Sequence, residues 1–135
     1  MAIKLINEKQ LWDRFVESTP QGLLYHKWDF LKLIEKHYKY NLLPYGIYKG
    51  EELICVFPMF QKRIKGINCL FSPPPQSGVP YLGFIMNETY HILKQSKKEA
   101  YLKIVAENID NEIKRISPNY FSASLSSANV KVDHF

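Results

Sequence analysis

The chain has 135 residues, of which 46% are hydrophobic and 23% charged, so it fits one globular domain and is neither disordered nor low-complexity by composition. Its apolar runs are short, as at 53–57 and 66–71, so no membrane span is predicted. The N-terminus lacks the apolar stretch of a signal peptide, and two cysteines, Cys55 and Cys69, do not make a disulfide framework. We therefore expect reduced core thiols and a cytoplasmic protein.

The formal net charge of +5 is compatible with binding to nucleic acid or to a membrane surface. The positive charge consists mostly of lysines scattered along predicted helices, and its densest cluster, at 61–65, holds only three cations. Because solvated lysine faces are common, charge alone does not favour a nucleic-acid partner.

The first quarter of the chain predicts one strand and two helices. Residues 2–6 alternate as a strand does, and Asn7 with Gln10 predicts a capping box that opens a helix. The segment STPQG at 18–22 ends that helix, and a short apolar run, LLYH, follows it. A second helix is expected from about Trp28 to Tyr38, with an apolar stripe of Trp28, Leu31, Ile34 and Tyr38.

Three strands are predicted next. The segments 42–48 and 53–60 favour a hairpin with a Lys-Gly turn between them. The segment 61–65 is polar, and Gly66 gives another turn before a strand over 67–71.

The last third of the chain predicts a helix from about Lys97 to Ile116, ended by Ser117-Pro118-Asn119, and a final strand over 120–126. The expected order is therefore β-α-α-β-β-β-α-β, with a meander of middle strands and a crossover helix before the last strand. This order predicts an α/β fold with a mixed sheet flanked by helices, with no internal repeat or domain boundary.

This order of elements resembles the first part of the GNAT acetyltransferase fold, up to its fifth strand. Six segments carry a further resemblance: WDRFV (12–16), STPQG (18–22), YH-x-W (25–28), G-x-Y (46–48), VFPMF (56–60), and SPPP (72–75) with Gly78 and Gly83. They resemble the opening of FemAB-like acyltransferases, which include peptidoglycan aminoacyl transferases and enzymes of polysaccharide loci.

Members of that family usually have two GNAT-like halves in one longer chain. The resemblance therefore implies that residues 1–135 form a single GNAT-like N-terminal half-domain whose partner is a missing C-terminal half. The ending ANVKVDHF looks like a chain cut in mid-fold. Such a cut would expose core surface, through which two copies could form a homodimer.

Active GNAT halves hold the CoA pyrophosphate with a glycine-containing loop, Gln/Arg-x-x-Gly-x-Gly/Ala, and the helix N-terminus behind it. Here that location is the segment 72–81, whose four prolines contribute no N–H donors. The nearest match, RIKGIN at 63–68, ends in Asn and leads into a strand, so we interpret it as a hairpin turn. We expect no cofactor in this half; a donor, acyl-CoA or aminoacyl-tRNA, would bind to the full-length protein.

Individual residues give weaker indications of chemistry. His26 could act as a general base or bind a substrate carboxylate, or it could make only local hydrogen bonds. The four histidines share no metal-ligand spacing, so no metal site is predicted. A tyrosine cluster over 38–48 could form a wall for a sugar or peptide, although ordinary strand packing explains it as well.

The stretch LFSPPPQSGVPYLGF at 70–84 has no two prolines three residues apart, which argues against a displayed proline-rich ligand. We interpret it as a stiff loop at the end of a central strand, where α/β folds place ligands. The residues expected to line an acceptor cleft there are Tyr25, His26, Ser72, Pro74, Gly78 and Tyr81. No catalytic residue is identified.

The expected function is the acceptor-side part of a FemAB-like or GNAT-type acyl or aminoacyl transferase, with a cell-wall, polysaccharide or amino-sugar acceptor. This half alone is expected to be inactive with acetyl-CoA. The alternatives are a non-catalytic GNAT-like binding module and a surface that contacts tRNA.

Overall fold

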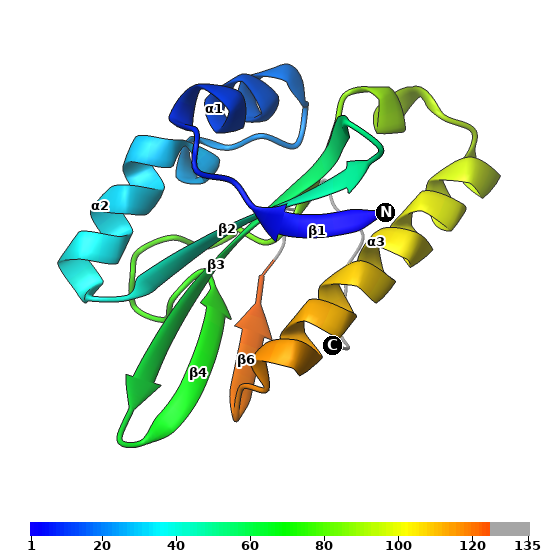
Figure 1. Cartoon of the computed structure of the whole chain (residues 1–135). Helices are drawn as coiled ribbons and strands as arrows, with labels where there is room; N and C mark the ends of the chain where they lie inside the picture. Colours follow the sequence, from blue (N-terminus) through cyan, green and yellow to red (C-terminus); the bar gives the residue numbers. More distant parts are fainter. Residues whose placement is uncertain (125–135) are drawn as a thin grey trace.

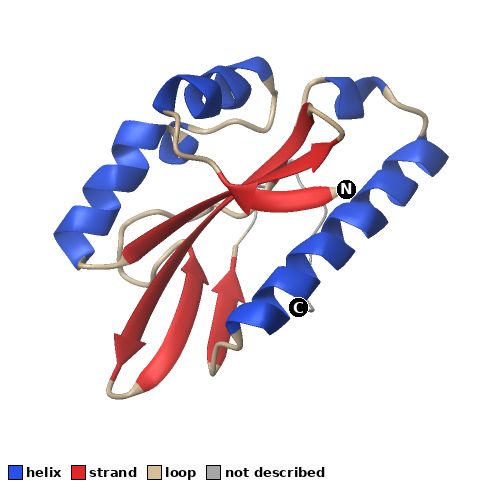
Figure 2. Cartoon of the chain, in the orientation of Figure 1, coloured by secondary structure: helices blue, strands red, loops and turns tan. Residues whose placement is uncertain are grey.

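A mixed sheet lies at the centre of the computed structural model, which describes residues 1–124 (Figures 1 and 2). Its strands are β1 (Ala2–Leu5), β2 (Asn41–Lys49), β3 (Glu52–Ile64), β4 (Ile67–Ser72), β5 (Ile85–Met86) and β6 (Tyr120–Ala123). The α-helices are α1 (Lys9–Ser18), α2 (Trp28–Tyr38) and α3 (Gln95–Ile116), and two 3-10 helices are η1 (Leu24–His26) and η2 (Thr89–Ile92).

The strand order is β1-β2-β3-β4-β6, antiparallel except for the parallel pair of β4 and β6. On the side away from β2, β3 pairs with two strands. Cys55 and Val56 pair with β5, and the segment 60–64 pairs with β4. The chain therefore leaves the sheet at the end of β4, returns at β5, and crosses over through α3 to β6. The α/β class, the mixed sheet and the crossover helix predicted from the sequence are confirmed.

Each face of the sheet has its own apolar layer. On one face α3 packs Val105, Ile109 and Ile113 into a cluster with strand residues such as Phe57 and Leu70. On the other face α1 and α2 pack a second cluster. The residues buried there are Trp12, Phe15, Val16, Leu31 and Ile34 of the helices, with Ile6, Leu42, Val56, Phe60, Leu82 and Ile85. The helices thus sandwich the sheet, as Figure 1 shows.

The apolar stripe on α2 gives the predicted bounds, and the helix ends where Lys39 adopts a left-handed conformation. Other boundaries differ from the prediction. The expected capping box at Asn7 is wrong, because α1 begins at Lys9 after Glu8, with no side-chain cap. The last three residues of the apolar run LLYH form η1. The helix α3 begins two residues before the predicted start at Lys97.

The segment 61–64 was expected to be a polar connection, yet it continues β3 as far as Ile64. The turn to β4 consists of Lys65 and Gly66, both with positive φ, which confirms that the glycine of RIKGIN closes a hairpin. The short elements β5 and η2 were absent from the predicted order. The final strand is described to Ala123, and the residues 125 and 126 of the predicted strand, like the segment ANVKVDHF, lie outside the described residues. None of the helices in the described part of the chain is long and apolar enough to cross a membrane.

Candidate functional site

The sheet divides beside Pro58, between the stretches of β3 that pair with β5 and with β4, and Ser72 lies at this division. Ser72 is fully buried; its hydroxyl donates to the carbonyl oxygen of Pro58 at 2.5 Å and accepts from the N–H of Gly83 at 2.9 Å. The side chain thereby joins β3, the last residue of β4 and the segment where the proline loop returns.

His26 holds the same returning segment from the side of α1 and α2. Its Nδ1 accepts from the N–H of Leu23 at 3.3 Å, so the ring proton resides on Nε2. Nε2 donates to the carbonyl oxygens of Leu82 at 3.1 Å and Gly83 at 3.3 Å. The residue is fully buried, and this burial lowers the pKa of the imidazole to about 4. The structure thus brings His26 and Ser72 together at one peptide unit.

The other residues predicted to line a cleft are distributed differently. Tyr25 is half-buried with its ring against the edge of Phe30, at 5.4 Å between centroids. Pro74 is buried, and its carbonyl oxygen accepts from the hydroxyl of Ser77 at 2.7 Å. Gly78 and Tyr81 are exposed, and Gly78 has a φ of 79° that favours glycine. Gly78 and Tyr81 are thus the only exposed residues among the six that were predicted to line the cleft.

Thr19 and Gln21, which the sequence indicates only as part of a helix stop, bond to the backbone of β5 on the side where no further described strand pairs with it. The side-chain oxygen of Gln21 accepts from the N–H of Met86 at 2.8 Å, and the hydroxyl of Thr19 donates to the Met86 carbonyl at 2.7 Å. Because that hydroxyl proton is used, Nε2 of His91 must donate to Thr19, at 3.3 Å. Both backbone groups of Met86 that face away from β3 therefore have side-chain partners.

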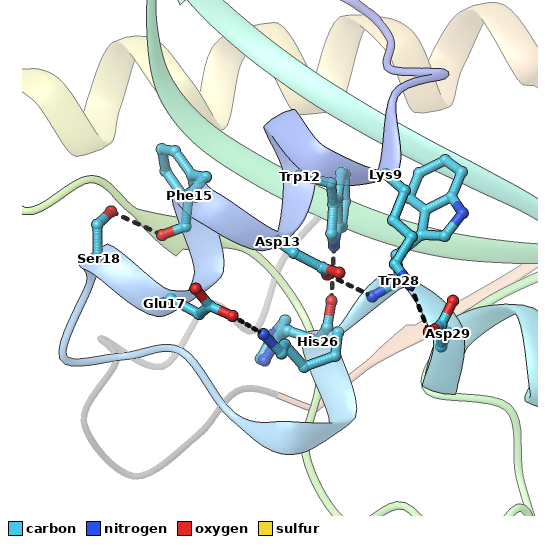
Figure 3. Close-up of polar contacts among 10 residues, drawn as sticks. Lys9, Trp12, Asp13, Phe15, Glu17, Ser18, His26, Trp28 and Asp29 are labelled. Carbon is cyan, nitrogen blue, oxygen red and sulfur yellow. Dashed lines mark hydrogen bonds and ion pairs between the residues drawn. The ribbon is translucent and has the colours of Figure 1, made fainter.

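The base of this region is held by contacts of α1 with η1 and with the start of α2 (Figure 3). The indole N–H of Trp12 donates to the carbonyl oxygen of His26 at 2.6 Å, and the carboxylate of Asp13 accepts from the N–H of Trp28 at 2.8 Å. The second contact satisfies a donor in the first turn of α2, where helices lack internal partners. Hydrogen bonds therefore hold both the backbone and the ring of His26 in place.

This geometry gives His26 and Ser72 a positioning role. Both nitrogens of His26 and the hydroxyl of Ser72 already have partners, and neither residue is accessible to solvent. A general base needs a free lone pair within reach of the proton that it removes. The structure gives no support to the hypothesis that His26 acts as a base or binds a carboxylate. The alternative of local hydrogen bonding holds for Nδ1 alone, because Nε2 donates to Leu82 and Gly83, which are distant along the chain.

A second polar cluster joins β2 to α3. The hydroxyl of Tyr45 donates to Glu112 at 2.5 Å, and Arg115 donates to the same carboxylate at 2.9 and 2.6 Å. Burial, with the carboxylate of Glu112, raises the pKa of Tyr45 to about 12, so the phenol stays protonated near neutral pH. Tyr45 packs on the α3 face while Tyr40 contacts Phe60 on the opposite face, so the predicted tyrosines do not form one wall.

Two hollows lined by described residues differ in size and position. One, of about 30 Å³, lies between β3, η2 and α3 and has room for little more than a water molecule. The other, of about 290 Å³, is open and lies at the far end of the sheet; its lining residues are Asn41, Gln61, Lys62, Arg63 and Asn68. No cluster of His, Cys, Asp and Glu suited to a metal ion is found within residues 1–124.

Comparison of the chain with protein-family models, with curated proteins and with solved structures finds no match. The fold is that of an α/β protein in which hydrogen bonds from Ser72 and His26 fix the loop that follows β4. The resemblance to FemAB-like acyltransferases is not tested by these comparisons and stays a prediction.

Proposed function

We propose that the chain is the acceptor-side, N-terminal part of a FemAB-like, GNAT-type acyl or aminoacyl transferase acting on a cell-wall, polysaccharide or amino-sugar acceptor. One observation carries the proposal: the proline loop leaves the carboxyl end of β4, and its returning segment is fixed by Ser72 and His26. In α/β folds ligands bind outside the carboxyl ends of strands, where the connections diverge. A loop fixed in this way is preorganised to form one wall of such a site.

The same loop explains why the donor is assigned to another part of the enzyme. Prolines occupy four positions between Ser72 and Tyr81 and provide no N–H groups. The helix α3 does not follow this loop directly, because β5 and η2 intervene before Gln95. A pyrophosphate cradle of the kind found between a strand and the next helix therefore lacks its donors here. In this proposal a second half of the full-length enzyme binds the donor, acyl-CoA or aminoacyl-tRNA.

Binding and turnover test the two parts of this proposal. Glucosamine and a peptidoglycan-precursor peptide are titrated into the isotopically labelled chain, and amide shifts are expected in the loop 76–83. Replacing Pro73, Pro74 and Pro75 by alanine is expected to weaken this binding more than it lowers the free energy of unfolding. If no acceptor shifts the loop, or if both quantities fall equally, the loop is purely structural. Acetyl transfer from acetyl-CoA by this chain alone would overturn the assignment of the donor.

A non-catalytic GNAT-like binding module is the second candidate, and the closure of the site favours it. Among the residues predicted to line the cleft, the acid–base group His26 and the hydroxyl of Ser72 are both buried with partners. A binding module needs a rigid wall and no reactive group. If an acceptor shifts the loop but the complete two-half protein transfers no acyl group to it, the binding module is the correct function.

A further inference from the structure

The open hollow of about 290 Å³ lies at the end of the sheet opposite the proline loop. It is formed where β2 begins, β3 ends and β4 begins, next to the Lys65-Gly66 turn. Its volume is at the lower end of the range for small-ligand sites. The described residues that line it are all polar: three carry side-chain amides and two are basic.

The register places four of these side chains on one face. Asn41 lies opposite Gln61, and Arg63 lies opposite Asn68. Gln61 also lies opposite Leu70, which belongs to the apolar cluster under α3. Because side chains two residues apart share a face, the four polar groups continue the α3 face beyond its apolar part.

The hydrogen bonds within this group leave a surplus of donors. The side-chain amide of Gln61 donates to that of Asn68 at 3.0 Å, which orients both amides. The amino group of Asn68 has no partner among the described residues. Arg63 uses one N–H on the carbonyl oxygen of Gly66, at 3.1 Å, which anchors the guanidinium beside the turn. Its other donors have no partner among residues 1–124, and neither has the amide of Asn41.

The electrostatics of the hollow also favour an anion. No carboxylate lines it. The carboxylate of Glu35 contacts Leu42, the residue after Asn41. It already accepts from the N–H of Leu42 at 2.6 Å and pairs with Lys32 at 3.3 Å. Lys62 also lines the hollow, but its side chain lies on the other face of β3, where its ammonium group donates to the carbonyl oxygen of Tyr38 at 3.0 Å.

We infer that this hollow binds a small ligand that carries one oxyanion and several hydroxyl groups. The guanidinium of Arg63 suits the oxyanion, since arginine forms charge-assisted pairs with both carboxylates and phosphates. The amides of Asn41, Gln61 and Asn68 offer both donors and acceptors, which suits hydroxyl groups. The site is distinct from the proline loop, so it does not depend on the proposed transferase function.

Amide shifts of the labelled full chain test the inference with three probes. Glucuronate supplies a carboxylate, glucose 6-phosphate a phosphate, and glucose the same hydroxyl groups without charge. We expect saturable shifts at Asn41, Asn68 and 61–63 with at least one anionic probe, with a dissociation constant on the order of millimolar. Glucose should give none, and the stronger anionic probe identifies the oxyanion.

Matched variants separate a site from general positive charge. Arg63→Gln is expected to weaken binding about tenfold. Arg14→Gln, an equal loss of charge at an exposed position of α1, should leave it unchanged. Asn68→Asp adds a negative charge inside the hollow and should abolish binding, whereas Asn111→Asp adds one on the exposed surface of α3 and should not. Arg63, Arg14 and Asn111 are exposed and Asn68 is half-buried, so unchanged thermal unfolding of each variant is the check that folding is intact.

The inference is overturned if neither anionic probe gives saturable shifts in the hollow, or if glucose produces the same shifts. It is also overturned if Arg14→Gln weakens binding as much as Arg63→Gln does, because the attraction would then belong to the net charge of the chain.

Discussion

The burial of His26 makes the stability of the fold depend on pH. Burial lowers the pKa of the folded-state imidazole to about 4, against 6.5 for an unhindered histidine. Above pH 6.5 the ring is neutral in both states, so the stability that it contributes is complete. Between pH 6.5 and 4 only the unfolded state binds the proton, and stability falls by about 1.4 kcal/mol per pH unit. Below pH 4 both states are protonated, and the total loss is about 3 kcal/mol.

Urea unfolding at intervals between pH 7.5 and 3.5 measures this loss. The comparison is with His26→Gln, in which the amide can still donate towards Leu82 but does not titrate. The difference in unfolding free energy between the two proteins should shrink by about 3 kcal/mol as the pH falls. The pKa of His91 is lowered too, and its contribution is present in both proteins and cancels. His37→Gln is the control for the substitution itself, because that side chain is exposed and its loss should change the free energy of unfolding little. Parallel curves for the wild type and His26→Gln would refute the reasoning.

Three further substitutions test the packing by chemical denaturation. Ser72→Ala leaves the buried N–H of Gly83 without its acceptor, and we expect a loss of about 1–3 kcal/mol; a loss near zero would mean that the hydroxyl is dispensable. Gly22→Ala places a Cβ 2.0 Å from the carbonyl oxygen of Val16, so we expect a loss of roughly 3 kcal/mol. At Gly78 a Cβ meets open space, so Gly78→Ala costs only the strain of a φ of 79°, about 1 kcal/mol. A larger loss of stability for Gly78→Ala than for Gly22→Ala would contradict the structure.

The elements that the sequence predicted well are those whose signal is local. The α2 stripe repeats at helical spacing, and its bounds were correct. The end of β3 was missed because Gln61 and Arg63 face the open hollow, so their polarity resembled that of a turn. The strand β5 was missed because its partner, at Cys55 and Val56, lies far away along the chain. Two residues carry too little alternation to indicate a strand.

The candidate site could be predicted only in part for a similar reason. The sequence placed a stiff loop at the end of β4, and the structure confirms that position. That His26 reaches Leu82, 56 residues away, depends on how η1 packs against the returning segment, which no local pattern encodes. Thr19 and Gln21 gave only the turn signal of their neighbours Pro20 and Gly22. Their role depends on a strand that was not foreseen.

The contacts of Thr19 and Gln21 with Met86 also bear on how the protein avoids self-association. An uncovered strand edge is a template on which another chain can add a strand, and aggregation commonly begins there. At β5 the outward backbone groups of Met86 are already occupied by two side chains from the α1–η1 connection. A side chain cannot propagate a ladder as a strand does, so the sheet is terminated at this point without leaving hydrogen-bonding groups unsatisfied. The helix stop between α1 and α2 therefore also protects the edge of the sheet.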